Sequence, residues 1–273
     1  MEYTGWVELQ PSEEHLAKFY SGEEQVEGLL ENQYLILQGA DGEPIDYYCY
    51  QNEECRQVRF NVINNNYSNT IKPKDPYQYC LIDLLKDKQS KIKIVKGVAG
   101  SGKDFLMFNE ALAMIEKGIF QKIVYIRPNV TVRDVPEIGY LKGGIDEKLA
   151  WTLGPLYDKV GGEVGIDALK NDEKLEVVPL PFIRGRSFEN SIVYVTEAQN
   201  MTVDTARLLV SRLGEGSELW INADSNQVDK KIYQEDNGVN AMVNSLKGLP
   251  LVGYVYLPNT HRSEVAELSN LIE

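Results

Sequence analysis

The chain has 273 residues, of which 43% are hydrophobic and 25% are charged, an ordinary balance for a soluble globular protein. This length accommodates one large domain, or a small domain followed by a large one. No apolar stretch is long enough to cross a bilayer, and the N-terminus lacks the basic-then-apolar layout of a signal peptide. Three cysteines without C-x-x-C spacing argue against a disulfide framework or a zinc site and indicate a reducing, cytoplasmic compartment: Cys49, Cys55 and Cys80.

The formal net charge of −13 is concentrated at one end of the chain. Residues 1–70 contain 3 Lys and Arg against 13 Asp and Glu, a net charge of −10. The rest of the chain contains 25 against 28, a net charge of only −3. Composition therefore neither establishes nor excludes a nucleic-acid partner, since residues 71–273 have room for a local basic groove.

Residues 1–70 are predicted to form a small, acidic, mostly β domain. A short helical stretch covers Glu13–Tyr20, and two apolar runs, Gln33–Leu37 and Ile45–Tyr50, flank the turn at Asp41-Gly42, which predicts a hairpin. Gln57–Val62 alternates like a third strand. The asparagine-rich segment Asn64–Asn69 and the prolines that follow it have the composition of a linker.

From Pro76 onward, apolar strands alternate with helical patterns. Continuous apolar strands separated by amphipathic helices predict an α/β fold, with a parallel sheet covered by helices on both faces. The expected strands are Ile92–Val95, Ile123–Ile126, Leu175–Val178, Ile192–Val195, Leu219–Ile221 and Val252–Leu257, and the expected helices are Phe105–Lys117, Ile145–Val160, Thr202–Leu213 and Val239–Lys247.

The strongest chemical motif is the run Gly97–Lys103, which reads G-x-x-x-x-G-K between an expected strand and an expected helix. In such a P-loop, glycines such as Gly97, Gly100 and Gly102 let backbone N–H groups, including that of Ser101, surround a phosphate chain at a helix N-terminus. Lys103 then reaches the terminal phosphates. The alternative is a glycine-rich turn that carries a surface lysine.

Two positions of the expected metal site depart from the usual pattern. A P-loop has Ser or Thr after its lysine to bind Mg²⁺, and this chain has Asp104. The buried strand that usually ends in an acidic metal-holding residue ends here in Thr196. We interpret the two residues as an exchanged metal-binding pair that conserves one hydroxyl and one carboxylate. The alternative is two separate losses in a protein that no longer hydrolyses nucleotide.

Polar residues after the strands supply candidate catalytic groups. Glu197 is expected to polarise the attacking water with the help of Gln199, and Gln227, in the polar run after Leu219–Ile221, is a candidate sensor of the γ-phosphate. Each has a plain alternative as a polar group at a strand end. Candidate arginines for neutralising phosphate charge are Arg127, Arg184, Arg186 and Arg262, and each is also compatible with a surface ion pair. His261 has no second histidine nearby and is expected to be structural.

In order and spacing, these motifs resemble the PhoH family of P-loop ATPases over most of residues 72–273. The matching segments are Gly97–Lys103, Ile126–Val130, Ile138–Gly143, Pro155–Asp158, Phe182–Phe188, Glu197–Asn200 and Asp224–Asp229. Two upstream segments, Asn32–Leu37 and Ile71–Gln78, resemble the section that joins the PIN and ATPase domains in the long form of the family. No PIN domain is expected in this chain, so RNase activity is not carried over.

The resemblance implies a RecA-like or helicase-like core, ATP and Mg²⁺ as ligands, and a ring-forming, RNA-associated ATPase, with a hexamer as one candidate assembly. Gln78 matches a glutamine with which helicases read adenine, and Arg262 matches a basic position that would act across a subunit interface. Three functions stay open: an ATPase that remodels or unwinds RNA, a nucleotide-binding scaffold with little hydrolysis, and an ATPase that acts on a protein partner through the acidic N-terminal domain.

Overall fold

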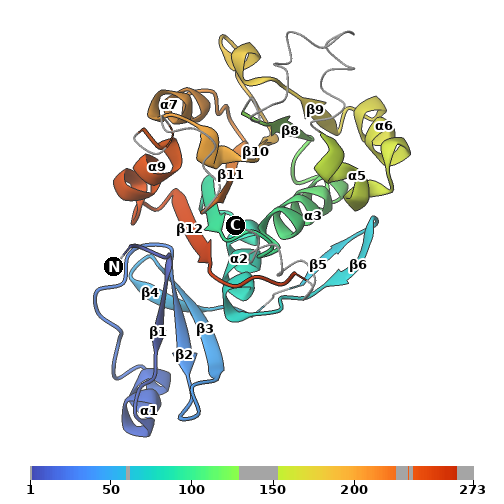
Figure 1. Cartoon of the computed structure of the whole chain (residues 1–273). Coiled ribbons are helices and arrows are strands. Elements are labelled where there is room, and N and C mark those ends of the chain that lie inside the picture. The colour runs from blue at the N-terminus through green and yellow to red at the C-terminus, as the bar shows by residue number, and fades with distance from the viewer. Residues whose placement is uncertain (1, 60–61, 129–152, 226–232, 234–235, 263–273) are drawn as a thin grey trace, which may run out of the picture.

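A six-stranded sheet forms the centre of this computed structural model, which describes all residues except 1, 60–61, 129–152, 226–232, 234–235 and 263–273 (Figure 1). Every neighbouring pair of its strands runs parallel, in the order β12-β7-β11-β10-β8-β9. All six predicted strands are confirmed: β7 (Ile92–Gly97), β8 (Lys122–Ile126), β9 (Leu175–Val177), β10 (Ser191–Val195), β11 (Glu218–Asp224) and β12 (Val252–Leu257). No described helix is long and apolar enough to span a membrane.

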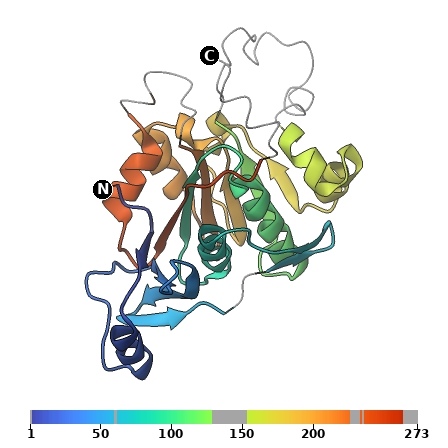
Figure 2. The ribbon, with the colours of Figure 1, turned by 60° about the horizontal axis from the view of Figure 1, so that its bottom comes forward.

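Helices cover both faces of this sheet, as predicted (Figures 1 and 2). Side chains alternate between the faces, so that Tyr194 packs into one apolar cluster and its neighbour Val193 into the other. Because both faces are buried, the strands read as continuous apolar runs. On one face, the first cluster includes residues of α2 (Pro76–Lys86), α3 (Lys103–Glu116), α5 (Gly154–Val160) and α6 (Glu163–Asn171). On the other face, the second cluster includes residues of α7 (Val203–Val210) and α9 (Gly238–Leu246). The short 3₁₀ helices η3 (Leu180–Ile183) and η4 (Ala198–Asn200) also contribute to the second cluster.

Three of the four predicted helices are confirmed with shifted ends, as α3, α7 and α9. The fourth, Ile145–Val160, is confirmed only as α5, since its first part lies outside the described residues. Two helices, α2 and α6, were not predicted. In α2, Pro76 occupies the first turn and Asp75 caps the end by accepting a hydrogen bond from the N–H of Gln78 (2.8 Å), a strong local start signal.

The N-terminal residues form a second, four-stranded sheet, with α1 (Glu13–Ser21) close to its predicted position. The predicted hairpin is confirmed, but the third strand is misplaced: Glu54–Gln57 pairs where Gln57–Val62 was expected, and residues 60–61 lie outside the described part. Asn52 and Glu53 both have positive φ, which closes a tight two-residue turn and starts the strand at once. The strands are β1 (Trp6–Leu9), β2 (Gln33–Gln38), β3 (Pro44–Gln51) and β4 (Glu54–Gln57).

The expectation of a linker at Asn64–Asn69 is wrong, because this segment belongs to a hairpin of β5 (Ile63–Asn65) and β6 (Ser68–Ile71). Asn65 explains the asparagine content. Its Oδ1 accepts hydrogen bonds from the N–H groups of Tyr67 and Ser68 within the turn. Its Nδ2 donates to Asn109 of α3, so the hairpin is fixed against the helix that follows the P-loop.

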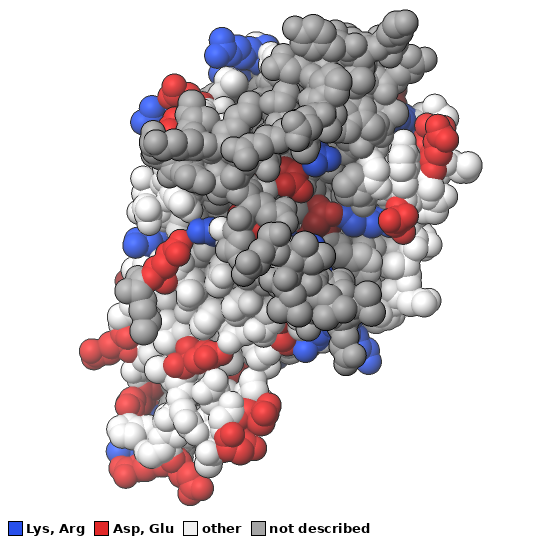
Figure 3. Space-filling view, viewed as in Figure 1, with Lys and Arg blue, Asp and Glu red and all other residues white. Residues whose placement is uncertain are grey.

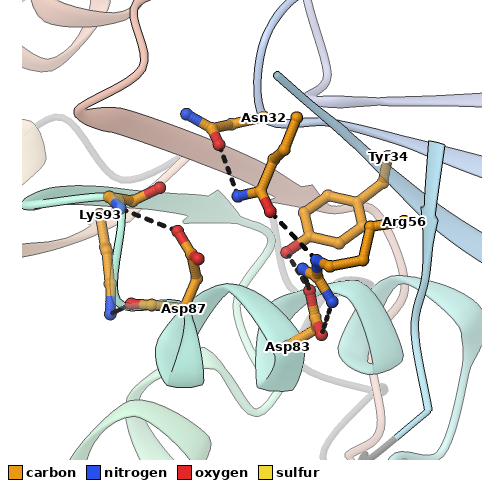
Figure 4. Close-up of polar contacts among 8 residues, drawn as sticks. Asn32, Tyr34, Arg56, Asp83, Asp87 and Lys93 are labelled. Atoms are coloured by element: carbon orange, nitrogen blue, oxygen red, sulfur yellow. Dashed lines mark hydrogen bonds and ion pairs between the residues drawn. The ribbon is translucent and has the colours of Figure 1, made fainter. Parts of the chain in front are cut away.

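Helix α2 joins the N-terminal sheet to the central sheet (Figure 4). The carboxylate of Asp83 accepts a hydrogen bond from the hydroxyl of Tyr34 (2.9 Å) and two from Arg56 (3.2 and 2.7 Å). Tyr34 and Ile36 of β2 also belong to the same apolar cluster as Leu81 of α2. The packing is thus continuous across residue 70, and the division into domains 1–70 and 71–273 stays a prediction.

Candidate nucleotide site

The loop between β7 and α3 has the geometry that a P-loop requires. Gly100 and Gly102 have φ angles of 78° and 80°, which glycine adopts without the steric penalty of a side chain. Gly102 is the N-cap of α3 and provides no side-chain cap, so the first N–H groups of the helix face the loop without a capping side chain. The buried Oγ of Ser101 has no hydrogen-bond partner among the residues that the structure describes. An unsatisfied hydroxyl beside uncapped N–H groups fits an anionic ligand such as phosphate.

Lys103 lies at the floor of this site with its charge already compensated. Its Nζ donates to the carbonyl of Val98 (3.1 Å) and forms an ion pair with Oδ2 of Asp224 (3.1 Å), and both charged side chains are almost buried. Asp224 ends β11, the strand next to the P-loop strand, where it pairs in register with Gly97. The arrangement holds the lysine close to the loop.

Asp104 is held by groups from three other elements. Its Oδ1 accepts hydrogen bonds from the hydroxyl of Tyr194 (2.7 Å) on β10 and from Nδ2 of Asn222 (2.9 Å) on β11. Its Oδ2 forms an ion pair with Lys159 of α5. The carboxylate therefore occupies a fixed position beside the P-loop lysine, although its oxygens are already shared with protein donors.

The loop after β10 places Glu197 with a strained backbone. Its φ of 53° lies in the left-handed region, which costs a non-glycine residue about 1–3 kcal/mol and is typical of functional sites. Gln199 connects this residue to the neighbouring strand: Nε2 donates to Oε2 of Glu197 (2.7 Å) and Oε1 accepts from the N–H of Asp224 (2.9 Å). Thr196, almost fully buried, follows β10 directly and lines the site together with Tyr125 of β8.

These groups line one small cavity of about 120 Å³ at the carboxyl ends of the parallel strands. Such an edge is where open α/β sheets bind their ligands. The structure thus brings Asp104 and Thr196, which are 92 positions apart in the sequence, to one cavity. The lining residues are Lys103, Asp104, Tyr125, Arg127, Thr196, Glu197, Asn222 and Asp224.

Several predicted site residues are not part of this cavity lining: Gly97, Gly100, Ser101 and Gly102 of the P-loop, and Gln78, Gln199 and Arg262. Gln78 is buried with its amide engaged by the backbone, since Oε1 accepts from the N–H of Lys74 (2.8 Å) and Nε2 donates to the carbonyl of Ser101 (2.9 Å). Arg262 lies against Gly100 of its own chain. Gln227 falls outside the described residues, as do the motif segments between residues 129 and 143.

The sequence analysis gave no individual role to five residues of the site, although Asp224 begins the matching segment Asp224–Asp229: Tyr125, Lys159, Tyr194, Asn222 and Asp224. Asn222 and Asp224 carry the clearest available signal, because they are polar residues two apart in a buried strand and therefore share one face. Tyr194 and Lys159 gave no such signal. A tyrosine is ordinary in a buried strand, and Lys159 reaches Asp104 only through the way α5 packs.

The chain is similar in sequence to known proteins over most of its length. Residues 70–269 match the sequence model of the family described as PhoH-like protein. The chain belongs to this family. It is 29% identical to protein PhoH2 of Bacillus subtilis, over 98% of this chain and 63% of the relative. It is 34% identical to protein PhoH2 of Mycolicibacterium smegmatis, over 72% of this chain and 46% of the relative.

A PhoH-like protein of Bacillus subtilis is 32% identical over 60% of this chain and 51% of the relative. The chain thus spans about half to two thirds of the length of these relatives. Family membership, the parallel sheet and the P-loop together identify an ATPase-type P-loop nucleotide-binding protein.

The tyrosine that holds Asp104 predicts a dependence of stability on alkaline pH. Burial, the charge of Asp104 and the hydrogen bond to it all raise the pKa of Tyr194 well above its usual value of 10. Above about pH 10 the unfolded chain loses this proton while the folded chain keeps it, so the group's contribution to stability falls as pH rises towards its folded pKa. For each such tyrosine the free energy of unfolding decreases by about 1.4 kcal/mol per pH unit.

We expect Tyr194→Phe to make the free energy of unfolding depend less steeply on alkaline pH, because the variant lacks the hydroxyl that ionises only in the unfolded chain. In urea unfolding measured at pH values between about 9 and 11, the free energy of unfolding of the variant should fall by about 1.4 kcal/mol less in total than that of the parent, because the unfolded tyrosine ionises across this range. Identical slopes for the two proteins would contradict the placement of a neutral Tyr194 against Asp104.

Proposed function

We propose that this chain binds ATP together with Mg²⁺ in the cavity beside the P-loop and hydrolyses it. The observation that carries the proposal is the convergence of Lys103 and Asp104 with Thr196 and Glu197 on one cavity from two separate segments. Phosphoryl transfer depends mainly on positioning and on charge stabilisation, and this set supplies a cation, oxygen ligands and a carboxylate base.

Each of the proposed roles follows from the position of the side chain. Lys103 and the N–H groups of Gly100 to Lys103 bind the phosphates, and Arg127, which also lines the cavity, adds positive charge. Asp104 and Thr196 hold the metal ion, since Mg²⁺ takes oxygen ligands, and the metal neutralises phosphate charge. Glu197, oriented by Gln199 at 2.7 Å, accepts the proton of the attacking water.

A nucleotide-binding scaffold with little hydrolysis is a second candidate function. It is favoured by the charge pairing of the site, in which Lys103 is paired with Asp224 and Asp104 with Lys159. A bound nucleotide has to compete with the first pair and a metal ion with the second. If the second pair persists, nucleotide binds without an efficient metal site.

We propose RNA as the polymer that couples to this ATPase, and an arginine-lined groove beside α7 supports it. The groove measures about 710 Å³ and contains Arg184, Arg207 and Arg212 with three hydroxyl side chains and one carboxylate, Asp204. Arg207 pairs with Asp204 (3.3 Å), whereas Arg184 and Arg212 form no ion pair with any described residue. Guanidinium groups without a carboxylate partner suit phosphate oxygens.

The charge distribution restricts where RNA can bind. Acidic side chains gather on the lobe that holds α1 and β1–β4 (Figure 3). A polyanion is repelled there, so the groove beside α7 is the better surface. The acidic lobe instead suits the alternative of a protein partner. A ring-shaped homo-oligomer and a cytoplasmic location complete the proposal.

The exchange of Asp104 and Thr196 is tested by four proteins: the parent, Asp104→Thr, Thr196→Asp and the double variant. Each single change should lower Mg²⁺-dependent phosphate release, because one leaves no carboxylate at the two positions and the other places two together. The double variant should recover much of the loss, since residues that share a site couple by roughly 0.5–3 kcal/mol.

Circular dichroism of all four proteins controls for folding, because Asp104→Thr also removes the acceptor of Tyr194, Asn222 and Lys159. A double variant as impaired as the two single changes combined would refute the exchange. A parent without turnover and a double variant with turnover would establish the scaffold function.

The RNA-binding groove is tested by the salt dependence of binding to a single-stranded RNA oligonucleotide. Each phosphate contact contributes about 0.7 to the slope of log affinity against log salt. Arg184→Gln and Arg212→Gln should each make the slope shallower by about this amount, as measured by fluorescence anisotropy. Arg59→Gln, at an exposed position of the acidic N-terminal region, is the matched control. Unchanged slopes, or no binding at any salt concentration, would exclude the groove.

A further inference from the structure

The segment after β12 lies against the P-loop and is joined to it by a backbone hydrogen bond. The N–H of His261 donates to the carbonyl of Gly100 (2.9 Å). The Nε2 of His261 lies 2.7 Å from Oδ2 of Asp75, and Nδ2 of Asn259 donates to the same oxygen (3.3 Å). His261 therefore connects the P-loop to the residue that caps α2.

Gln78 connects Asp75 to the P-loop by a second route. The Oδ1 of Asp75 accepts from the N–H of Gln78 (2.8 Å), and Nε2 of Gln78 donates to the carbonyl of Ser101 (2.9 Å). The imidazole is mostly buried, with 20% of its side chain exposed, and the carboxylate of Asp75 is 9% exposed. His261 and Gln78 both contact Asp75, and each also donates a hydrogen bond to a P-loop carbonyl, that of Gly100 and that of Ser101 respectively. These contacts form a closed ring that includes the P-loop backbone.

This arrangement fixes the next residue, Arg262, over the P-loop. A Cβ atom built on Gly100 would lie 2.7 Å from both Cδ and Nε of Arg262, so the arginine side chain fills the space above that glycine. Gly100 also requires glycine for its φ of 78°. The guanidinium is therefore next to the loop that would surround the phosphates of its own chain.

We infer that Arg262 serves the nucleotide site of its own chain and that His261 is the residue that positions it. The inference rests on the proposed nucleotide site, and it replaces the expectation that Arg262 acts across a subunit interface. A guanidinium is always charged and binds phosphate oxygens in a planar, two-donor geometry. Held beside Gly100, it neutralises phosphate charge without a partner subunit.

The first test measures the affinity of a fluorescent ATP analogue in the presence of Mg²⁺. Arg262→Ala should weaken binding by on the order of 10-fold, the effect of losing one charge-assisted hydrogen bond. His261→Ala should weaken it by a smaller factor, because the arginine is present but no longer held. His261→Gln should restore part of the loss, since its amide can donate to Asp75, whereas His261→Leu, which fills similar space without a donor, should not. Lys170→Ala, on the exposed face of α6, is the control.

The second test mixes two defective chains by co-expression. Lys103→Ala chains carry an intact Arg262, and Arg262→Ala chains carry an intact P-loop lysine. If the arginine serves its own chain, nucleotide binding and turnover of the mixture equal the average of the two separate proteins. A mixture that exceeds this average several-fold would show that the arginine acts across an interface and would overturn the inference.

Further outcomes separate the inference from the proposed function. Tighter nucleotide binding by Arg262→Ala would show that the arginine blocks the loop, and unchanged binding would show that it takes no part. Either result refutes the inference alone, provided that binding by the parent depends on Lys103. A parent that binds no nucleotide, or that binds equally well as Lys103→Ala, would refute the proposed function and the inference together.

Discussion

The turn between β7 and α3 is the constraint on which the rest of the structure depends. Three of its carbonyl groups accept hydrogen bonds from other parts of the chain. Gln78 donates to the carbonyl of Ser101, the N–H of Ser225 to that of Gly97 (3.0 Å), and the N–H of His261 to that of Gly100. A Cβ on Gly97 would lie 2.9 Å from Cβ of Leu257, so β12 also closes on the loop. Loops are ordinarily mobile, and these contacts make this one a fixed support for a ligand.

The charged side chains Lys103 and Asp104 of the nucleotide site already form ion pairs within the protein. Burying Lys103 or Lys159 alone would cost several kcal/mol, and their pairing with Asp224 and Asp104 offsets that cost. A phosphate chain that reaches Lys103 exchanges one carboxylate partner for another set of oxygens. Binding of a nucleotide therefore replaces existing ion pairs with contacts to the ligand. The binding affinity depends on the free energy needed to separate Lys103 from Asp224 and Asp104 from Lys159.

Most of the central sheet was predictable because both faces of each strand are buried, which leaves continuous apolar runs such as Ile123–Ile126. The P-loop was predictable because its glycines and lysine serve backbone geometry and charge that few other turns require. Helix α2 was missed because two prolines suggested a linker, although Asp75-Pro76 is also a helix start. The hairpin of β5 and β6 was missed for a similar reason, since asparagines favour both turns and linkers.

The rest of the site depended on tertiary packing that no local pattern records. Lys159 reaches Asp104 from a helix 55 positions away, and Arg262 lies on Gly100 because β12 ends beside the P-loop. The exchanged pair was predicted from two departures at known motif positions. The structure adds that both residues line one cavity with Lys103, whereas their role in holding a metal ion stays a prediction.

The most direct test of the account is a titration of phosphate release from ATP, with and without single-stranded RNA, for the parent and for Lys103→Ala. The account predicts Mg²⁺-dependent turnover by the parent that rises with RNA, and a loss of at least about 10-fold in Lys103→Ala, since a charged contact to the phosphates disappears. Lys170→Ala should match the parent. Equal turnover by the parent and Lys103→Ala would contradict the assignment of the P-loop cavity as the ATPase site.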